Sequence, residues 1–287
     1  MRDKFAKPIK IIGHRGACSI APENTLAAAA KAHETGADLW ETDVSVTRDG
    51  QLVLFHDRTL ERTTDAKTLF PGRKSYRLSD FTLEELALLN PGGVFIKSDP
   101  FGMIRKGDLG QEDLEAMKTE KIPTLTQGLL FTKEKNWMVN LELKETIDSV
   151  PLFPFAEKVV GTILASGIPV QCVKISSFHH KWLVEIRRLV PEIEVQALIS
   201  PKMIKAALDP DSPFETFNID QAMIDKNIMT RLLRQKKRVN AYTVNSVKMA
   251  EKLRKLGVKA VFSDYPQVLA PLFQEKFQAL FGKQTKK

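Results

Sequence analysis

Residues 239–263 read VNAYTVNSVKMAEKLRKLGVKAVFS and hold one complete strand, helix and strand unit. Two short apolar runs, Val239–Val244 and Ala260–Ser263, flank a stretch, Val247–Leu256, whose apolar residues recur at helical spacing. Gly257 follows that stretch directly, at the position where glycine commonly ends a helix. Because a helix is the usual crossover between parallel strands, this segment predicts an α/β fold with a parallel sheet.

The same alternation of strand and helix patterns extends over the chain. The runs that we predict to be parallel strands are Ile9–Gly13, Asp38–Val44, Met138–Leu143, Cys172–Ser176, Glu194–Ile199, Phe217–Ile224, Val239–Val244 and Ala260–Ser263. Eight parallel strands in a chain of 287 residues fit one (β/α)8 barrel. We therefore predict a single α/β domain that covers residues 1–287.

One further extended run, Gln51–His56, does not fit this count. Three turn residues, 48–50, separate it from the second strand, and so short a link joins only antiparallel neighbours. We expect a hairpin arm that carries His56 to the rim where the second strand ends. Residues 58–121 then lose the regular pattern, with scattered glycines and phenylalanines, and we predict that they form an inserted lobe with some helix.

The composition excludes several classes of protein. With 43% hydrophobic and 27% charged residues, the chain is not disordered, collagen-like or a coiled coil. No apolar run approaches the ~20 residues that cross a bilayer, and the N-terminus lacks the apolar core of a signal peptide, which predicts a cytoplasmic protein. Cys18 and Cys172 are expected to be reduced thiols. Residues 226–287 carry 15 Lys and Arg against 3 Asp and Glu, which favours anionic partners, although a solvated helix face explains such a run more often.

Carboxylates lie on two of the predicted strands. Glu41 and Asp43 are two residues apart, so both side chains project to one face of their strand. Glu142 and Lys144 share a face of the third predicted strand in the same way. Since buried carboxylates are costly unless they are paired or coordinated, three of them predict an oxygen-rich site for Mg²⁺ or Ca²⁺. The alternative is a purely structural salt bridge between Glu41 and Lys144.

The first predicted strand ends with His14 and Arg15, at the mouth of the barrel, where barrel enzymes have their active sites. An arginine offers paired donors to a phosphate, and a histidine titrates near neutrality. The hairpin arm is expected to bring His56 to the same rim. Packing does not explain two histidines, three carboxylates, an arginine and a lysine at one place, so we expect a catalytic site.

Ten short motifs of the chain, taken in order, resemble those of the glycerophosphodiester phosphodiesterase family. They are GHRG (13–16), PENT (22–25), ETDV (41–44), TRDG (47–50), LFHD (54–57), IPTL (122–125), LELK (141–144), SSF (176–178), YTVN (242–245) and SDYP (263–266). The resemblance covers roughly residues 9–268. It implies a TIM barrel with an inserted lobe after the HD element, and metal-dependent hydrolysis of glycerophosphodiesters to sn-glycerol 3-phosphate and an alcohol.

The resemblance also implies roles for residues at the matching positions. These are an acid–base pair (His14 and His56), two phosphate-facing cations (Arg15 and Lys144), three ligands of one divalent ion, Mg²⁺ or Ca²⁺ (Glu41, Asp43 and Glu142), and a substrate pocket (Phe178 and Tyr242). The implied mechanism is attack on phosphorus by the glycerol 2-hydroxyl, followed by opening of the cyclic phosphate by water, and it leaves open which histidine is the acid. The chain departs from the family where Thr126 and Gln127 replace an acidic pair and where Tyr242 replaces a tryptophan.

Two other functions remain open. A lysophospholipase D-like enzyme would act on membrane lysophospholipids, with the apolar stretch Val268–Phe281 in weak peripheral contact with the bilayer. An inactive barrel would bind anionic lipid or nucleic acid through its basic C-terminal region, but the chain has no aromatic stacking motif beside those charges. We expect a small-molecule substrate and no nucleic-acid partner. Phe81, Phe95 or Phe101 of the inserted lobe are expected to line a pocket for the leaving alcohol.

Overall fold

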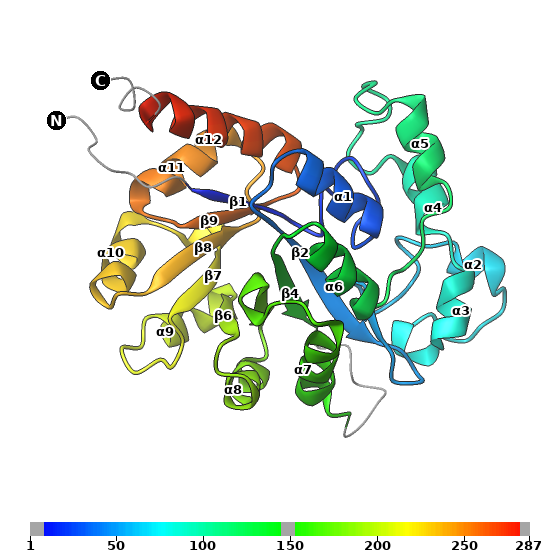
Figure 1. Ribbon diagram of the computed structural model, residues 1–287, viewed down its shortest axis with the longest axis horizontal. Coiled ribbons are helices and arrows are strands. Elements are labelled where there is room, and N and C mark those ends of the chain that lie inside the picture. The colour runs from blue at the N-terminus through cyan, green and yellow to red at the C-terminus, as the bar shows by residue number, and fades with distance from the viewer. Residues whose placement is uncertain (1–8, 145–152, 282–287) are drawn as a thin grey trace.

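The computed structural model describes residues 9–144 and 153–281, with side chains described as far as residue 273 of the last helix. Its centre is a closed barrel of eight parallel strands (Figure 1). The strands are β1 (Lys10–Gly13), β2 (Leu39–Val46), β4 (Val139–Leu143), β5 (Val173–Ser177), β6 (Glu194–Ile199), β7 (Thr216–Asp220), β8 (Arg238–Tyr242) and β9 (Ala260–Ser263). The barrel closes because β1 pairs with both β2 and β9. The predicted TIM barrel is confirmed.

Helices surround the barrel (Figure 1). They are α1 (Leu26–Glu34), α6 (Leu125–Glu134), α7 (Phe155–Ser166), α8 (His180–Leu189), α9 (Ile204–Ala207), α10 (Lys226–Arg234), α11 (Val247–Leu256) and α12 (Pro266–Phe281). Thr124 and Gln127 form the capping box that opens α6, and Gly257 ends α11 with a positive φ of 98°. None of the described helices is long and apolar enough to cross a membrane.

The hairpin arm is the strand β3 (Leu52–Leu54), which pairs antiparallel with β2 as predicted. Gly50, with a φ of 74°, makes the tight turn between the two strands. The Oγ1 of Thr47 accepts a hydrogen bond from the backbone N–H of Gln51 and fixes that turn. The chain leaves β3 at Phe55 and reaches His56 at the C-terminal rim of the barrel.

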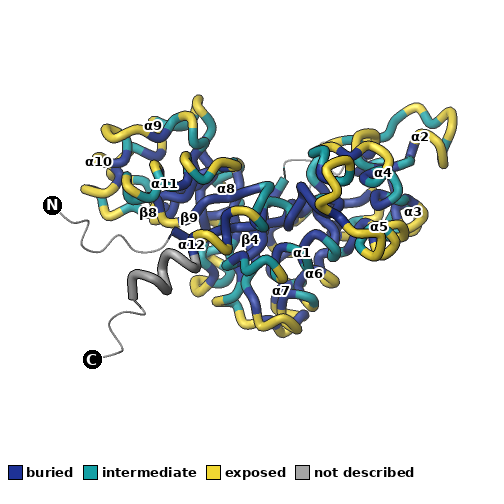
Figure 2. The backbone as a smooth tube through the Cα atoms, turned by 90° about the horizontal axis from the view of Figure 1, so that it is seen from above, coloured by how far each residue is buried: buried dark blue, intermediate teal, exposed yellow. Residues whose placement is uncertain are grey.

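Residues 58–121, called the 58–121 segment below, contain four short helices. These are α2 (Ala66–Leu69), α3 (Leu83–Leu88), α4 (Pro91–Ser98) and α5 (Gln111–Met117). They gather at one end of the molecule, beside the buried strands of the barrel (Figures 1 and 2). Buried apolar side chains of the segment form a cluster together with Val53, Phe55 and Ile122. The helix that we expected in this segment is therefore present.

Phe81 is part of that cluster, so the expectation that it lines a substrate pocket is wrong. Its side chain is fully buried, and the guanidinium of Arg73 lies 3.9 Å from its ring centroid. The whole ring of Phe81 is packed inside the 58–121 segment. The predicted strand over 217–224 is also too long, because the carboxylate of Asp220 accepts a hydrogen bond from the backbone N–H of Ala222 and starts a 3-10 turn there.

Candidate active site

The three predicted metal ligands meet at the C-terminal rim of the barrel. Asp43 on β2 pairs in register with Glu142 on β4, and Glu41 lies two residues before Asp43 on the same face. Each of the three carboxylates has an oxygen that lies within 4.8 Å of those of the other two. Glu41 and Asp43 are only 2% and 1% exposed. The structure therefore packs an oxygen-only donor set into the mouth of the barrel.

Glu41 is the least compensated of these groups. Its Oε2 accepts a hydrogen bond of 2.8 Å from the backbone N–H of Arg15, whereas its buried Oε1 has no partner among the described residues. Burial, followed by repulsion from Asp43 and Glu142, raises the pKa of Glu41 well above its usual range. An orphaned carboxylate oxygen inside an acidic cluster is what a bound divalent cation would satisfy, so the residues fit such an ion.

Asp43 has more partners. The Nδ2 of Asn24 donates to Asp43 Oδ2 at 2.8 Å, Arg15 Nε lies 3.5 Å from the same oxygen, and Lys144 Nζ lies 3.5 Å from Oδ1. Burial alone would raise the pKa of Asp43, but Lys144, Arg15 and His56 hold it below its usual range. Lys144 also donates to Glu142 Oε1 at 2.7 Å. The alternative salt bridge from Lys144 to Glu41 is therefore wrong, since Lys144 pairs with the other two carboxylates.

Each predicted catalytic histidine is held by an aspartate. His14 Nδ1 lies 2.6 Å from Asp264 Oδ1, and His56 Nδ1 lies 2.6 Å from Asp57 Oδ1. Because an ionised carboxylate only accepts hydrogen bonds, each ring has a hydrogen on Nδ1, and in a neutral ring Nε2 is then the acceptor. Asp264 stays ionised: burial opposes its charge, but bonds from His14, Asn245 and Cys18 lower its pKa to about 2.

Neither aspartate was singled out from the sequence for this role. Asp57 directly follows His56 in LFHD, and Asp264 belongs to SDYP, so both stood in quoted motifs without a function. The sequence could not indicate Asp264 because it lies 250 residues from His14. The two residues meet only because β1 and β9 are neighbours in the closed barrel.

A chain of ion pairs connects Arg15 to His56, and the sequence analysis missed its middle members. Arg15 Nη1 donates to Glu23 Oε1 at 2.9 Å, and Arg62 donates to both oxygens of Glu23 at 2.7 Å. Arg62 Nε also donates to Asp57 Oδ2 at 2.6 Å. Arg62 belongs to the 58–121 segment, so this segment contacts both the loop after β1 and the residue that holds His56.

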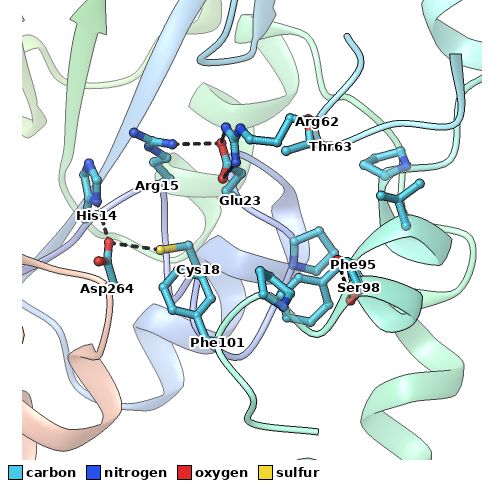
Figure 3. A pocket seen from close by; sticks show the side chains of 14 residues that line it. His14, Arg15, Cys18, Glu23, Arg62, Thr63, Phe95, Ser98, Phe101 and Asp264 are labelled. Atoms are coloured by element: carbon cyan, nitrogen blue, oxygen red, sulfur yellow. Dashed lines mark hydrogen bonds and ion pairs between the residues drawn. The ribbon is translucent and has the colours of Figure 1, made fainter. Parts of the chain in front are cut away.

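A cavity of about 360 Å³ opens beside His14, between the loop after β1 and helix α4 (Figure 3). Phe95 and Phe101 line it, so two of the three phenylalanines that we expected at a pocket border this cavity. Phe178 and Tyr242 are not among its lining residues. Their rings contact each other edge to face at 6.3 Å, and the Tyr242 hydroxyl donates to the carbonyl of Ile199.

The remaining histidines pack against aromatic rings. His33 meets Trp137 edge to face at 5.1 Å, and His179 lies 4.3 Å from the ring of Trp182. His180 contacts Phe214 and also bonds the carbonyl of Leu198 at 3.0 Å. All three are half-buried.

Comparison with known proteins connects this site to one family. The model of the glycerophosphoryl diester phosphodiesterase family matches residues 14–268. A glycerophosphodiester phosphodiesterase of Bacillus altitudinis is 32% identical over 274 residues, which are 93% of this chain and 98% of the relative. One from Caldanaerobacter subterraneus is 30% identical over 92% of this chain and 98% of its own length.

Solved structures agree in fold. An Oleispira antarctica phosphodiesterase, in complex with the product sn-glycerol-3-phosphate, superposes with a TM-score of 0.73 at 28% identity, covering 93% of this chain and 97% of that one. A protein of Silicibacter pomeroyi superposes with a TM-score of 0.77 at 20% identity, covering 94% of each chain.

Proposed function

Because the chain belongs to the glycerophosphoryl diester phosphodiesterase family, we propose that it hydrolyses glycerophosphodiesters to sn-glycerol 3-phosphate and an alcohol by two-histidine catalysis with one divalent metal ion. The enzyme is a phosphoric diester hydrolase, as are its relatives by name. One observation carries the mechanism: two imidazoles, each fixed through Nδ1 by an aspartate, lie at the rim that also holds the acidic cluster.

Glu41, Asp43 and Glu142 would hold the metal ion, and oxygen ligands of this kind favour Mg²⁺ or Ca²⁺. When bound, such an ion supplies positive charge to the phosphoryl oxygens as their charge grows. The orphaned Oε1 of Glu41 supports the assignment.

The two histidines divide the proton transfers between them. One Nε2 takes the proton of the glycerol 2-hydroxyl as that oxygen attacks phosphorus, and the other ring, protonated, gives a proton to the leaving alkoxide. Water then opens the cyclic phosphate with the roles reversed. Asp264 and Asp57 keep the rings oriented and stabilise the imidazolium that each ring becomes.

Arg15 and Lys144 are the proposed phosphate-facing cations. Both are already paired with carboxylates, Arg15 with Glu23 and Lys144 with Glu142, so their charges are positioned before the substrate arrives. Burial opposes the charge of Lys144, but Asp43 and Glu142 raise its pKa, and it stays protonated at neutral pH. A cation held in place in this way adds to transition-state stabilisation without reorganisation.

The 58–121 segment, as an inserted lobe of the single barrel domain, would provide the pocket for the leaving alcohol through Phe95 and Phe101. Phe178 and Tyr242 would line another part of the pocket at the ends of β5 and β8. The apolar rings of the cavity also favour a second candidate, lysophospholipase D-like hydrolysis, in which an acyl chain would occupy the cavity. The intact set of site residues gives no support to an inactive barrel.

Release of sn-glycerol 3-phosphate from glycerophosphocholine, assayed with Mg²⁺, Ca²⁺ or EDTA, tests this function. We expect hydrolysis with a divalent ion and none after EDTA treatment and dialysis. His14→Ala and His56→Ala should each lose about 10²- to 10⁴-fold in kcat, while His33→Ala, which is remote from the rim, should be near neutral. Full activity without metal would overturn the metal site, and wild-type turnover of His56→Ala would overturn the two-histidine mechanism. Faster hydrolysis of lysophosphatidylcholine than of glycerophosphocholine would favour the second candidate.

A further inference from the structure

A second group of potential metal ligands lies on the cavity side of His14. Cys18 Sγ donates to Asp264 Oδ1 at 3.2 Å, and the same oxygen lies 2.6 Å from His14 Nδ1 (Figure 3). Each residue offers an atom within 4.8 Å of the other two. None of the three is a member of the Glu41, Asp43 and Glu142 cluster, so the group needs an interpretation of its own.

The donor set has a different chemistry from that of the acidic cluster. It combines an imidazole nitrogen, a sulfur and one carboxylate, which is a combination that Zn²⁺ binds and that Mg²⁺ and Ca²⁺ do not favour. Zn²⁺ holds such donors at about 2.0–2.3 Å and so keeps them roughly 3.3–3.8 Å apart. The sulfur and the carboxylate already approach that separation, and His14 and Asp264 would need to part by roughly 1 Å.

The surroundings provide what a zinc site needs besides its ligands. The Nδ2 of Asn245 donates to Asp264 Oδ2 at 2.6 Å, and Asn245 Oδ1 accepts from the Asp264 backbone N–H, so the carboxylate is oriented from outside the group. All three residues border the cavity of about 360 Å³, which gives an ion a way in and leaves room for a water as the fourth ligand.

We propose that His14, Cys18 and Asp264 form an inhibitory Zn²⁺ site, separate from the acidic cluster. Binding forms Zn–N, Zn–S and Zn–O bonds and releases one proton to solvent, from the Cys18 thiol, while the hydrogen of the neutral His14 ring moves from Nδ1 to Nε2 by exchange with water. The ion takes the place of the hydrogen bond between His14 and Asp264, so the imidazole can no longer gain and lose protons as the mechanism requires. Only the inhibition, and not the binding of the ion, rests on the proposed function.

The hydrogen on the Cys18 thiol in the metal-free protein makes the site selective for ions that bind thiolate strongly. The Cys18 thiol donates its hydrogen to Asp264 Oδ1, so that proton must leave before the sulfur can bind a metal as a thiolate. Only an ion with a strong preference for thiolate displaces that proton. A millimolar concentration of Mg²⁺ is therefore expected to leave the group unchanged.

Cobalt absorption tests the binding without using catalysis. Co²⁺ is titrated into the metal-free enzyme, and the thiolate-to-cobalt charge-transfer band in the near ultraviolet is recorded. We expect the band in the wild type and in Cys172→Ser, whose cysteine is remote from the group, and no band in Cys18→Ser or Cys18→Ala. Thermal unfolding of all four proteins confirms that they fold. A band of equal intensity in folded Cys18 variants, or no band in the wild type, would overturn the site.

Zinc inhibition tests the consequence. Each protein is assayed on glycerophosphocholine at saturating Mg²⁺ with increasing Zn²⁺, and each rate is divided by the rate of the same protein without zinc. The half-inhibiting Zn²⁺ concentration should rise at least tenfold in Cys18→Ser and stay unchanged in Cys172→Ser. Equal inhibition of all variants would overturn the inhibitory role and place the zinc at the acidic cluster. If the wild type hydrolyses no glycerophosphodiester, the proposed function fails, while the cobalt band still decides the binding site.

Discussion

Arg62 is the residue through which the 58–121 segment acts on the site. Its guanidinium donates to Glu23 and to Asp57, and these carboxylates also contact Arg15 and His56, respectively. A planar guanidinium with five donors matches two carboxylates at once, which a lysine does not. Arg15 and His56 are thus both linked, through one carboxylate each, to the single side chain of Arg62.

We expect Arg62→Met to lower kcat on glycerophosphocholine about 10- to 100-fold, because Glu23 and Asp57 would lose their shared partner and repel each other. Arg62→Lys should recover part of the loss. Arg105→Met removes the ion pair between an exposed arginine and Asp99 in the same segment and should leave kcat unchanged. Steady-state kinetics of the three variants measure the difference, and equal rates for Arg62→Met and the wild type would contradict the positioning role.

Glu41 gives the opposite kind of prediction, a gain in stability with a loss of function. In metal-free protein the Glu41→Gln variant removes a buried, poorly compensated charge and should raise the free energy of unfolding by about 1–3 kcal/mol. Burial raises the folded pKa of Glu41, so the wild type loses stability as the pH rises above the ordinary carboxyl range. The gain is therefore largest near pH 7 and vanishes as the pH falls to about 4.

Urea unfolding in EDTA at several pH values checks this, with the exposed Glu112→Gln as the matched control. With excess Mg²⁺ or Ca²⁺ the order should reverse, because the wild type alone is stabilised by the bound ion. A Glu41→Gln protein that is less stable than the wild type at pH 7 in EDTA would show that the cluster is compensated without metal.

At the scale of single elements, α4 forms one wall of the cavity, and Gly92 allows this helix to pack closely against α5. A Cβ atom at Gly92 would lie 1.8 Å from the carbonyl oxygen of Met117, at the end of α5. The two helices therefore touch through backbone. No such contact surrounds Gly161 in the middle of α7, where a Cβ would meet nothing within 4 Å.

Gly92→Ala should lower the free energy of unfolding by about 1–3 kcal/mol through overpacking, and should raise KM because α4 carries Phe95. Gly161→Ala should instead stabilise the protein by about 0.5–1 kcal/mol, since alanine is the better helix former, with no change in KM. Urea unfolding and steady-state kinetics of the two variants test the contrast. A neutral Gly92→Ala would mean that α4 and α5 can separate freely.

The elements also show what could be predicted from sequence. The strand pattern and the three-residue turn at 48–50 predicted β2 and β3, because both signals depend only on residues that are close in sequence. The acidic cluster followed, since neighbouring strands share a rim. Glu23 and Arg62 could not be predicted, because their pairing depends on how the 58–121 segment folds back over the barrel. The burial of Phe81 depends on the same packing, and short helices with little amphipathic pattern do not specify it.

At the scale of the whole molecule, the two ends of the barrel have different roles. One end holds the candidate site, and the opposite end contributes to stability. At the end opposite the site, Glu194 at the start of β6 accepts a 2.5 Å bond from Lys174 Nζ and also contacts Gln196. Burial alone would raise the pKa of Glu194, but Lys174 holds it below its usual range. We therefore expect the ion pair between Lys174 and Glu194 to stabilise the closed barrel and to have no part in the chemistry.

Glu194→Gln should therefore reduce the free energy of unfolding by about 1–3 kcal/mol at pH 7 and leave kcat unchanged. Because the folded pKa of Glu194 is lowered, its contribution is present above the ordinary carboxyl pKa and is lost as the pH falls through the folded value. The difference between variant and wild type should shrink below about pH 4. Glu215→Gln, which removes an exposed partner of Arg238, should change stability by less than about 0.5 kcal/mol.

The closure of the barrel by β1 and β9 has a consequence for biosynthesis. Asp264 is added to the growing chain 250 residues after His14, which takes on the order of tens of seconds at ~5–20 residues per second. During that interval one edge of β1 has no partner, and His14 has no carboxylate to orient it. A nascent chain is therefore expected to be catalytically silent until Asp264 has been added, and the open edge of β1 is the surface that a chaperone would have to shield.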